Sequence, residues 1–573
     1  MRRSLLKRRS QKNGAENGFT LALGIVALVM VIPMMGLVVD VGFLYGVKGQ
    51  LQASVDGAAL AAARSLTLGA STAAQATSAK QTALNWFYAN FPDNTWGTSN
   101  TQMDTTDSHV MVYDDASNPN LRHVDVIANT TVPTYFMKWL GATTNVIYAK
   151  GNATRRDAVV MMVLDRSGSM GATCTQLKDA AKLFTGQFAA GRDRIGLISF
   201  AGGVKIQSSP IQDFQNTLGY TNSTTGTGLI DTIKCNGGTG SAEALSLAYN
   251  ELYKINLPGA LNIIMFETDG APNEGVYNWW DGTSYGLTNT SNCADTNGKM
   301  PGTGAGRGGW TAANQAPAWY GGYTMNPTGF TGYMPNIAAG AIGGFYRDNS
   351  SFYLMESPDN ASVNTTSNDE YLGGSGCQFN TSGLTSNYSD FAWLPATDVY
   401  GDAISPNYPS ANIVPSGRST AGYKAVTTGT NGRTIFNGSG SDATNAQNAN
   451  INVAENAAYR ARGSLKSCNG STCLATTNNL PTYMFVVGLG GNGGVDHTLL
   501  QRIANDPNGD VFNTSGGPGP NGGYYWPCSD NTHSAACATF SNQLHGQYIY
   551  SPNSTQLNSA FLLVASQVLR LSN

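Results

Sequence analysis

The sequence predicts an α/β domain built on a doubly wound parallel sheet, carried behind a membrane-spanning helix. The run from Ala158 to Leu164 is apolar at every position, which is typical of a strand covered on both faces. Apolar strands then alternate along the chain with helices of 3.6-residue periodicity, the pattern of parallel βαβ units. A third observation, an uncharged run near the N-terminus, predicts the membrane-spanning helix.

The composition favours an exported protein and gives no sign of nucleic-acid binding. Charged residues make up only 12% of the 573 residues, whereas about 25% is usual in soluble domains. The 68 glycines also exceed the usual share of about 7%. The formal net charge is -3, so no basic surface for DNA or RNA is expected.

The N-terminus predicts a single-pass anchor. Residues 1–18 form a basic head, and residues 19–43 form the expected transmembrane helix. Its uncharged run from Phe19 to Val39 has roughly 21 residues, enough to cross a bilayer, and membrane helices tolerate a proline such as Pro33. The positive-inside rule keeps the head in the cytoplasm, so the bulk of the chain is expected to be periplasmic or extracellular, anchored in the inner membrane. A cleavable signal peptide is the alternative, but the apolar run is longer than a signal core, and no small-x-small site follows promptly.

A connecting segment is expected over residues 44–155. The helix continues into it, because Leu51, Val55, Ala58, Ala62 and Leu66 recur at helical spacing. Further expected elements are a helix at Thr82–Phe91, strands at Val110–Tyr113 and His123–Ile127, one or two helical turns at Tyr135–Leu140, and a strand at Asn145–Ala149. A long helix followed by a small sheet is similar to pilin-like subunits, and a generic α+β spacer is the equal alternative.

The membrane-proximal residues resemble the N-terminal segment of TadG-like proteins of the Flp/Tad pilus-assembly machinery. The matching residues are Val38-Val39-Asp40-Val41-Gly42 and Val55-Asp56-Gly57-Ala58-Ala59-Leu60, and the resemblance covers about the first 70 residues. Gly18-Phe19-Thr20-Leu21 also looks like a prepilin processing site. The position five residues beyond Gly18 is Leu23, where a type IV-like prepilin carries Glu, so the resemblance does not extend to a main pilus subunit.

The α/β domain is expected over residues 156–573. After the first strand, the expected elements are a helix at Gln176–Phe188, strands at Arg194–Phe200 and Val204–Gln207, a helix at Ala242–Leu252, a strand at Asn262–Phe266, a helix at Val453–Leu465, a strand at Thr482–Gly488, a helix at His497–Ala504, a strand at Gln547–Tyr550 and a helix at Gln556–Leu571. An insertion at about 271–450, rich in Gly, Asn, Ser, Thr and aromatic residues, interrupts the domain. It follows the carboxyl end of a strand, so it is expected either to cap the ligand-binding edge or to form a subdomain beside it.

A candidate metal site follows the first strand of this domain. Asp165, Ser167 and Ser169 alternate on a Gly-containing turn at the strand's carboxyl end, where parallel sheets bind ligands. One carboxylate and two hydroxyls are hard oxygen ligands, which suit Mg²⁺, Mn²⁺ or Ca²⁺ better than zinc or copper. The alternative interpretation is an ordinary Ser/Gly turn in which Asp165 caps the next helix.

Two later segments complete a resemblance to the von Willebrand factor type A domain with its metal-ion-dependent adhesion site, a Rossmann-like fold. That family carries Asp-x-Ser-x-Ser, a Thr on a later loop, and an Asp ending the fourth strand. Asp165, Ser167, Ser169, Thr239 and Asp269 match these positions in order. The resemblance covers about 157–270 and 450–573. It implies that the hydroxyls contact the metal, that the carboxylates bind it directly or through water, and that a partner's carboxylate completes the shell.

An enzyme is the competing interpretation, and the sequence does not favour it. No GxxxxGK[ST] motif occurs, and no GxGxxG follows a strand. Neither Ser167 nor Ser169 lies in a GxSxG elbow. The five histidines are scattered along the chain, so no catalytic residue is assigned.

The eight cysteines predict disulfides, because the chain is expected outside the cytoplasm and contains no CxxC motif. The expected pairs are Cys468–Cys473, Cys528–Cys537, Cys293–Cys377 and Cys174–Cys235. The last pair would tie together the two loops that supply Ser169 and Thr239.

The function expected from these observations is that of a membrane-anchored extracytoplasmic protein of the Tad/Flp pilus or of an envelope adhesion system. It would bind a partner protein, such as a pilus or envelope component, through the Mg²⁺ site. The alternative is a scaffold or minor pilin-like component of pilus assembly, in which the metal only stabilises the fold. An enzyme housed in the insertion is the third hypothesis.

Overall fold

The computed structural model describes residues 16–272, apart from 202–203, 220–227 and 236–238, and then short strands between 276 and 435. It resumes over 450–508, apart from 452, 460, 463–465, 470–471, 476–479, 491–494 and 507, and ends with 543–572. The chain forms two compact units. The first holds residues up to 155, and the second holds 156–572 with 70–72.

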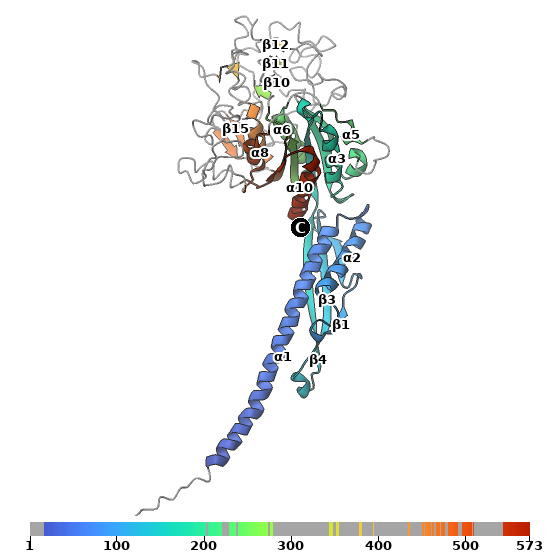
Figure 1. Cartoon of the computed structure of the whole chain (residues 1–573), viewed down its shortest axis with the longest axis vertical. Coiled ribbons are helices and arrows are strands. Elements are labelled where there is room, and N and C mark those ends of the chain that lie inside the picture. The colour runs from blue at the N-terminus through green and yellow to red at the C-terminus, as the bar shows by residue number, and fades with distance from the viewer. Residues whose placement is uncertain are drawn as a thin grey trace, which may run out of the picture. The chain divides into compact units, whose positions relative to one another are not determined.

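The first unit is organised along one 50-residue helix, α1, Glu16–Ser65 (Figure 1). The large apolar side chains of its N-terminal half, from Leu23 to Val39, are exposed, and this helix is long and apolar enough to cross a membrane. The predicted stripe in its C-terminal half, Leu51, Val55, Ala58, Ala62 and Leu66, is buried in the core of the unit. The predicted continuation of the helix beyond residue 43 is therefore confirmed.

A helix and a small sheet pack along the C-terminal half of α1. The elements are α2 (Thr72–Asn90), η1 (Thr95–Gly97), β1 (Ser99–Gln102), β2 (Val110–Asp114), β3 (Leu121–Pro133), η2 (Met137–Leu140) and β4 (Thr144–Arg156). β3 pairs with the other three strands. β3 and β4 have 13 residues each, longer than predicted, and α2 begins ten residues before the predicted Thr82.

The second unit contains a six-stranded sheet in the order β18-β17-β8-β5-β6-β7. Its strands are β5 (Ala158–Asp165), β6 (Arg194–Phe200), β7 (Val204–Ile211), β8 (Leu261–Thr268), β17 (Thr482–Leu489) and β18 (Gln547–Ser551). The strands are parallel except β7, which is antiparallel to β6 at one edge. β5 and β8 are buried at every position, as their continuous apolar runs predict.

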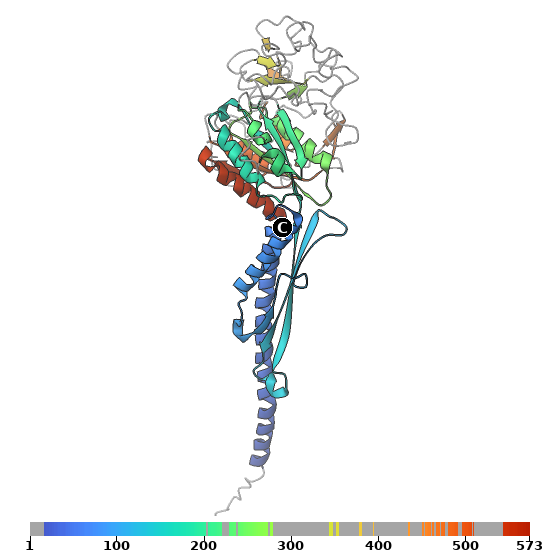
Figure 2. The ribbon, with the colours of Figure 1, turned by 90° about the vertical axis from the view of Figure 1, so that its right-hand side faces the viewer.

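Helices cover both faces of this sheet (Figure 2). On one face α3 (Cys174–Thr185) and α10 (Leu557–Ser572) share a core with alternate residues of β5, and the short helices α4 (Phe214–Leu218) and α5 (Leu229–Thr232) join it. α6 (Ser241–Ile255) contacts β5 to β8, and α8 (His497–Ala504) contacts β17 and β18, outside that core. The predicted doubly wound fold is confirmed.

The insertion is described only in part. Four strands form an antiparallel sheet: β9 (Val276–Asn278), β10 (Gly343–Arg347), β11 (Ser351–Tyr353) and β12 (Gln378–Asn380). One antiparallel pair follows in the insertion, β13 (Trp393–Leu394) with β14 (Thr434–Ile435). Beyond the insertion, β15 (Lys466–Asn469) pairs with β16 (Thr472–Ala475) in the same antiparallel sense. The predicted capping of the metal edge involves residues outside the described ones and stays a prediction.

Candidate metal centre

The candidate site lies at the carboxyl ends of two neighbouring parallel strands. β5 ends in Asp165, and β8 pairs with β5 so that Leu164 lies opposite Glu267. Asp269 follows β8 by one residue and therefore emerges at the same edge of the sheet as Asp165. The register of β5 against β8 brings together two carboxylates, Asp165 and Asp269, that are far apart in the sequence. The sequence does not state this register directly.

Backbone hydrogen bonds shape the turn that follows β5. The amide of Arg166 donates to the carbonyl of Phe200 on β6 at 2.7 Å. The amide of Ser167 donates to Asp165 Oδ1 at 2.7 Å. The single turn η3 (Gly168–Met170) follows, and Met170 is buried in the core beneath it. These contacts hold the Ser167 and Ser169 hydroxyls above the end of the sheet.

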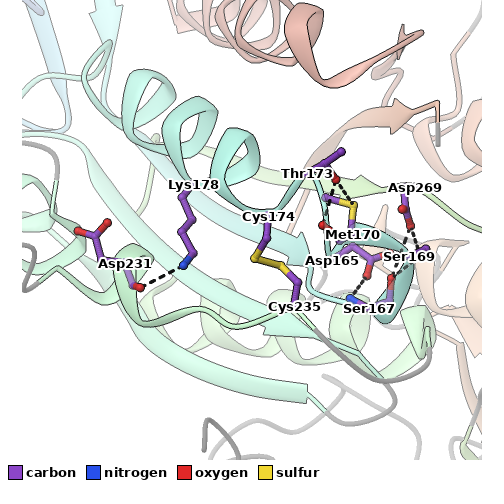
Figure 3. Close-up of a disulfide and its surroundings, with 10 residues drawn as sticks. All are labelled: Asp165, Ser167, Ser169, Met170, Thr173, Cys174, Lys178, Asp231, Cys235 and Asp269. Atoms are coloured by element: carbon purple, nitrogen blue, oxygen red, sulfur yellow. Dashed lines mark hydrogen bonds between the residues drawn. A yellow bond between two sulfur atoms is a disulfide. The ribbon is translucent and has the colours of Figure 1, made fainter. Parts of the chain in front are cut away.

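Three side-chain oxygens converge at this edge (Figure 3). Ser167 Oγ lies 3.0 Å from Ser169 Oγ, and Ser169 Oγ donates to Asp269 Oδ1 at 2.6 Å. Ser167 Oγ lies 3.5 Å from the same Asp269 oxygen. The structure thus brings Ser167, Ser169 and Asp269 into one cluster, with Asp165 joined to it through the Ser167 amide.

Thr239, the fifth predicted residue, lies at the same edge on a different loop. It is buried directly before α6, and the amide of the next residue, Gly240, donates to the carbonyl of Ala201 at 2.6 Å. Ala201 directly follows β6, the strand beside β5. The Thr239 loop is therefore held near the strand end that carries Asp165.

The site concentrates negative charge in a buried place. Burial, followed by the charge of Asp269, raises the pKa of Asp165 to about 7. Burial likewise raises the pKa of Asp269, although hydrogen bonds from Ser169 and Ser167 oppose the rise. Two ionised carboxylates are therefore costly here without a cation, and a divalent ion would favour their charged forms.

A disulfide supports the loops of the site. Cys174, the first residue of α3, is bonded to Cys235, with Cα atoms 5.9 Å apart (Figure 3). Lys178, one turn along α3, donates to the carbonyl of Asp231 in α5 at 3.2 Å, four residues before Cys235. The predicted Cys174–Cys235 pair is confirmed, and it holds the segment that leads to Thr239.

Of the other three predicted cysteine pairs, the structure describes the residues of only one. β15 and β16 place Cys468 directly opposite Cys473 in the ladder, so this pairing is compatible with the backbone and stays a prediction. Cys293, Cys377, Cys528 and Cys537 lie outside the described residues.

Two residues of the site were missed by sequence reasoning. Thr268 Oγ1 donates to Asp165 Oδ2 at 2.5 Å, so both carboxylate oxygens of Asp165 accept hydrogen bonds. Glu267 is fully buried, and burial followed by the charges of Asp165 and Asp269 raises its pKa well above the usual range. The available signal was their position next to Asp269, because residues that end a buried strand reach the ligand-binding edge.

Comparison with known families matches two parts of the chain. Residues 160–271 match the family model described as the von Willebrand factor type A domain. The chain carries a type A domain. Residues 18–65 match the family model described as putative Flp pilus-assembly TadE/G-like, which associates the chain with pilus assembly. The resemblances to a Tad pilus-assembly segment and to a type A domain are confirmed, whereas the metal-ion-dependent adhesion site stays a prediction. A comparison with curated proteins found no match.

Three solved structures illustrate what the chain is similar to. The PilB minor pilin from Streptococcus sanguinis is 11% identical over a match that covers 81% of this chain and 78% of that one, with a TM-score of 0.28. The vWF domain of the type V pili tip protein Mfa5 from Porphyromonas gingivalis is 13% identical, with 74% and 98% covered and a TM-score of 0.29.

The structure of three N-terminal domains of Mfa5 is 19% identical over 31% of this chain and has a TM-score of 0.18. The match spans only 28% of the length of that structure. TM-scores of this size support no inference about the site or the function of the present chain.

The donor set of the type A domain fits a hard divalent cation. Oxygens bound to Mg²⁺ at about 2.1 Å and at right angles lie roughly 3.0 Å apart. The three oxygen separations at the site, 2.6, 3.0 and 3.5 Å, bracket that value. Among the described residues no group of three or more His, Cys, Asp or Glu is suited to a metal. The proposed ligand oxygens, from Asp165, Asp269 and three hydroxyls, are hard donors, which suit Mg²⁺ better than zinc.

Proposed function

We propose that the type A domain binds a partner protein through a divalent cation. Ser167, Ser169 and Thr239 would hold the ion through their hydroxyl oxygens, and Asp165 and Asp269 would neutralise it directly or through water. Mg²⁺ is the proposed ion, with Mn²⁺ or Ca²⁺ as alternatives. When bound, the ion supplies a positive centre that accepts a carboxylate from the partner.

One observation supports this proposal above the others: the convergence of Ser167, Ser169 and Asp269 oxygens within 3.5 Å at the carboxyl edge of the sheet. An ordinary Ser/Gly turn would not explain why a second buried carboxylate, Asp269 directly after β8, joins the cluster. Like charges that are buried together cost free energy unless a cation compensates them. The role proposed is binding, with no catalytic residue assigned.

The partner is proposed to be a component of the pilus or the cell envelope. The TadE/G-like match at residues 18–65 supports the pilus association. α1 fits a single-pass anchor by length and composition, which supports a place in the inner membrane with the type A domain on the far side from the basic head. No interaction with nucleic acid is proposed.

The second candidate function is structural. In that case the TadE/G-like segment scaffolds pilus assembly or forms a minor pilin-like component, and the metal only stabilises the type A domain. The exposed N-terminal half of α1 and the sheet packed on its C-terminal half favour this alternative, because they form a unit with its own core.

Calorimetry on the full chain in detergent micelles tests metal binding, with Mg²⁺, Mn²⁺ and Ca²⁺ titrated separately. Saturable binding of one ion is expected in the wild type. The double variant Ser167→Ala with Ser169→Ala should bind at least roughly tenfold more weakly, because loss of even an indirect metal contact costs that much. Ser559→Ala, which removes an exposed hydroxyl from α10, should bind as the wild type does. Absence of saturable binding by all three ions would refute the proposal.

The same double variant separates the two functions in cells. If partner binding through the metal is the function, pilus assembly or adhesion is lost while the variant stays folded and membrane-bound. Assembly and adhesion that persist in a variant unable to bind metal would assign the protein to the scaffold role.

A further inference from the structure

The β3–β4 connection presents an apolar tip that the fold of its own unit leaves uncovered. We call residues 135–140 the hairpin tip. Trp139 is 83% exposed and Leu140 is 75% exposed, whereas Tyr135 and Phe136 are 49% and 43% exposed. Four neighbouring apolar side chains on one short connection form a surface that water disfavours, and such patches mark interaction sites.

Two contacts fasten the hairpin tip to the N-terminal half of α1. Gly36 lies under the Phe136 ring so closely that a Cβ there would come within 2.6 Å of it. Asp40 accepts hydrogen bonds from the amides of Tyr135, Phe136 and Met137 at 2.9, 2.8 and 2.6 Å. Gly36 and Asp40 are one helical turn apart and lie on one face of α1. They are also the only buried residues between 22 and 40.

An apolar cavity of about 410 Å³ lies between the hairpin tip and α1. From α1 it is lined by Ile32, Pro33 and Leu37, and from the tip by Phe136, Met137, Trp139 and Leu140. The cavity is open to the same exposed surface of α1 that runs from Leu23 to Val39. Its lining is therefore continuous with the apolar surface of the predicted membrane span.

A membrane span of this length would place the cavity within the bilayer. The uncharged run of roughly 21 residues is about 32 Å long at 1.5 Å per residue, and the hydrocarbon core is about 30 Å thick. A helix that spans with this run has almost no spare length, so Asp40 would lie at the interface. Gly36 and Pro33 lie about 6 and 10 Å closer to the bilayer centre. Side chains packed at these levels are below the headgroups.

Most backbone amides of the hairpin tip are hydrogen-bonded within the protein. Asp40 accepts three of its amides, and the amide of Trp139 donates to the carbonyl of Phe136. Just beyond the tip, the amides of Gly141 and Ala142 donate to Lys138 and Met137, and Thr134 donates to Thr143. Backbone polar groups that enter lipid need partners within the protein, and these bonds supply them for the amides named here.

We propose that the hairpin tip enters the lipid leaflet beside α1, with acyl chains of that leaflet filling the apolar cavity. Trp139 and Leu140 would contact lipid, and the exposed Lys138 would extend its ammonium group toward the headgroups. The proposal rests on the membrane anchorage given under the proposed function and is independent of the metal site. Lipid is the occupant because the cavity joins the lipid-facing surface of α1 and carries no charged side chain in its lining.

Site-specific fluorescence in vesicles tests the proposal. The full chain carrying Leu140→Cys is labelled with the environment-sensitive fluorophore NBD without reductant and reconstituted into phosphatidylcholine–phosphatidylglycerol vesicles. The wild type, carried through labelling, measures any reaction of the native cysteines. The matched control is Ala116→Cys, an exposed position at the opposite end of β3.

The expected result is blue-shifted emission from position 140 that nitroxide-bearing acyl chains quench severalfold more than they quench position 116. Emission like that of position 116, with equal quenching by aqueous iodide, would overturn the proposal. A blue shift without quenching by lipid would also overturn it, because a protein would then cover the tip. Brominated lipids provide a second measurement without a label: they should quench the wild type more than Trp139→Phe, and equal quenching would contradict the proposal.

Flotation of the same vesicles distinguishes failure of the hairpin-tip proposal from failure of the membrane anchor. If the protein does not float with the vesicles, both the anchor and the hairpin-tip proposal fail. If it floats while position 140 reports water, only the hairpin-tip proposal fails, and metal binding by the type A domain is unaffected.

Discussion

Removing the Cys174–Cys235 disulfide should destabilise the type A domain by an amount that its loop length predicts. The bond closes a loop with a sequence separation of 61. Closing a loop of that length lowers the entropy of the unfolded chain by about 14 cal/mol/K. At 25 °C this destabilises the unfolded state by about 4 kcal/mol. Both cysteines are only partly buried, so serine replacements add little cost in the core.

The measurement is amide hydrogen exchange in α3 and β5 of the full chain, because a chain with two compact units does not unfold in one two-state step. Cys174→Ser, Cys235→Ser and the double variant should each lower the opening free energy of the slowest amides by about 2–4 kcal/mol. The three losses should be nearly equal, since either single variant already removes the whole crosslink. If the proposed metal site binds Mg²⁺, its affinity should fall in parallel, because Cys235 lies four residues before Thr239.

Two results would refute this reasoning. Unchanged exchange in the double variant would show that the loop is held by other contacts, such as Lys178 with the carbonyl of Asp231. Losses that simply add, so that the double variant loses twice as much as each single one, would show that the cysteines act separately and are not bonded to each other.

Three further predictions concern other contacts. Gly36→Val should speed amide exchange at residues 135–137, because its Cβ would collide with Phe136, whereas Gly24→Val, where a Cβ meets nothing within 4 Å, should leave it unchanged. Asp40→Ala should lower the opening free energy of the same amides by about 3 kcal/mol or more, since three donors lose their acceptor at about 1–3 kcal/mol each; unaltered exchange would contradict it. Glu455→Ala should destabilise α8 by about 3–5 kcal/mol, measured by exchange in residues 497–504, because it breaks the buried ion pair with Arg502. Glu455→Leu with Arg502→Met should recover much of that loss, and equal damage in both variants would argue against a charge effect.

Local sequence patterns were sufficient to predict most helices and strands of the type A domain. The strands β5 and β8 are buried on both faces. Their continuous apolar runs therefore predict buried strands directly. α8 occupies the predicted His497–Ala504 without change. α2 was predicted too short because its first buried positions are Gln75 and Ala79, which do not stand out as an apolar stripe. The antiparallel edge strand β7 was likewise not recognisable as such, because strand direction is a property of pairing.

The sequence by itself determined the type of each main element and the identity of the five candidate metal ligands. Only the tertiary structure decided how they meet. Thr268 reaches Asp165 across 103 residues, and Met137 reaches Asp40 across 97. Periodicity depends on neighbours in the chain and can be read from residue order. Convergence of oxygens, or of a hairpin tip on a membrane helix, depends on which strands pair, in which register, and on where a glycine leaves room for a ring.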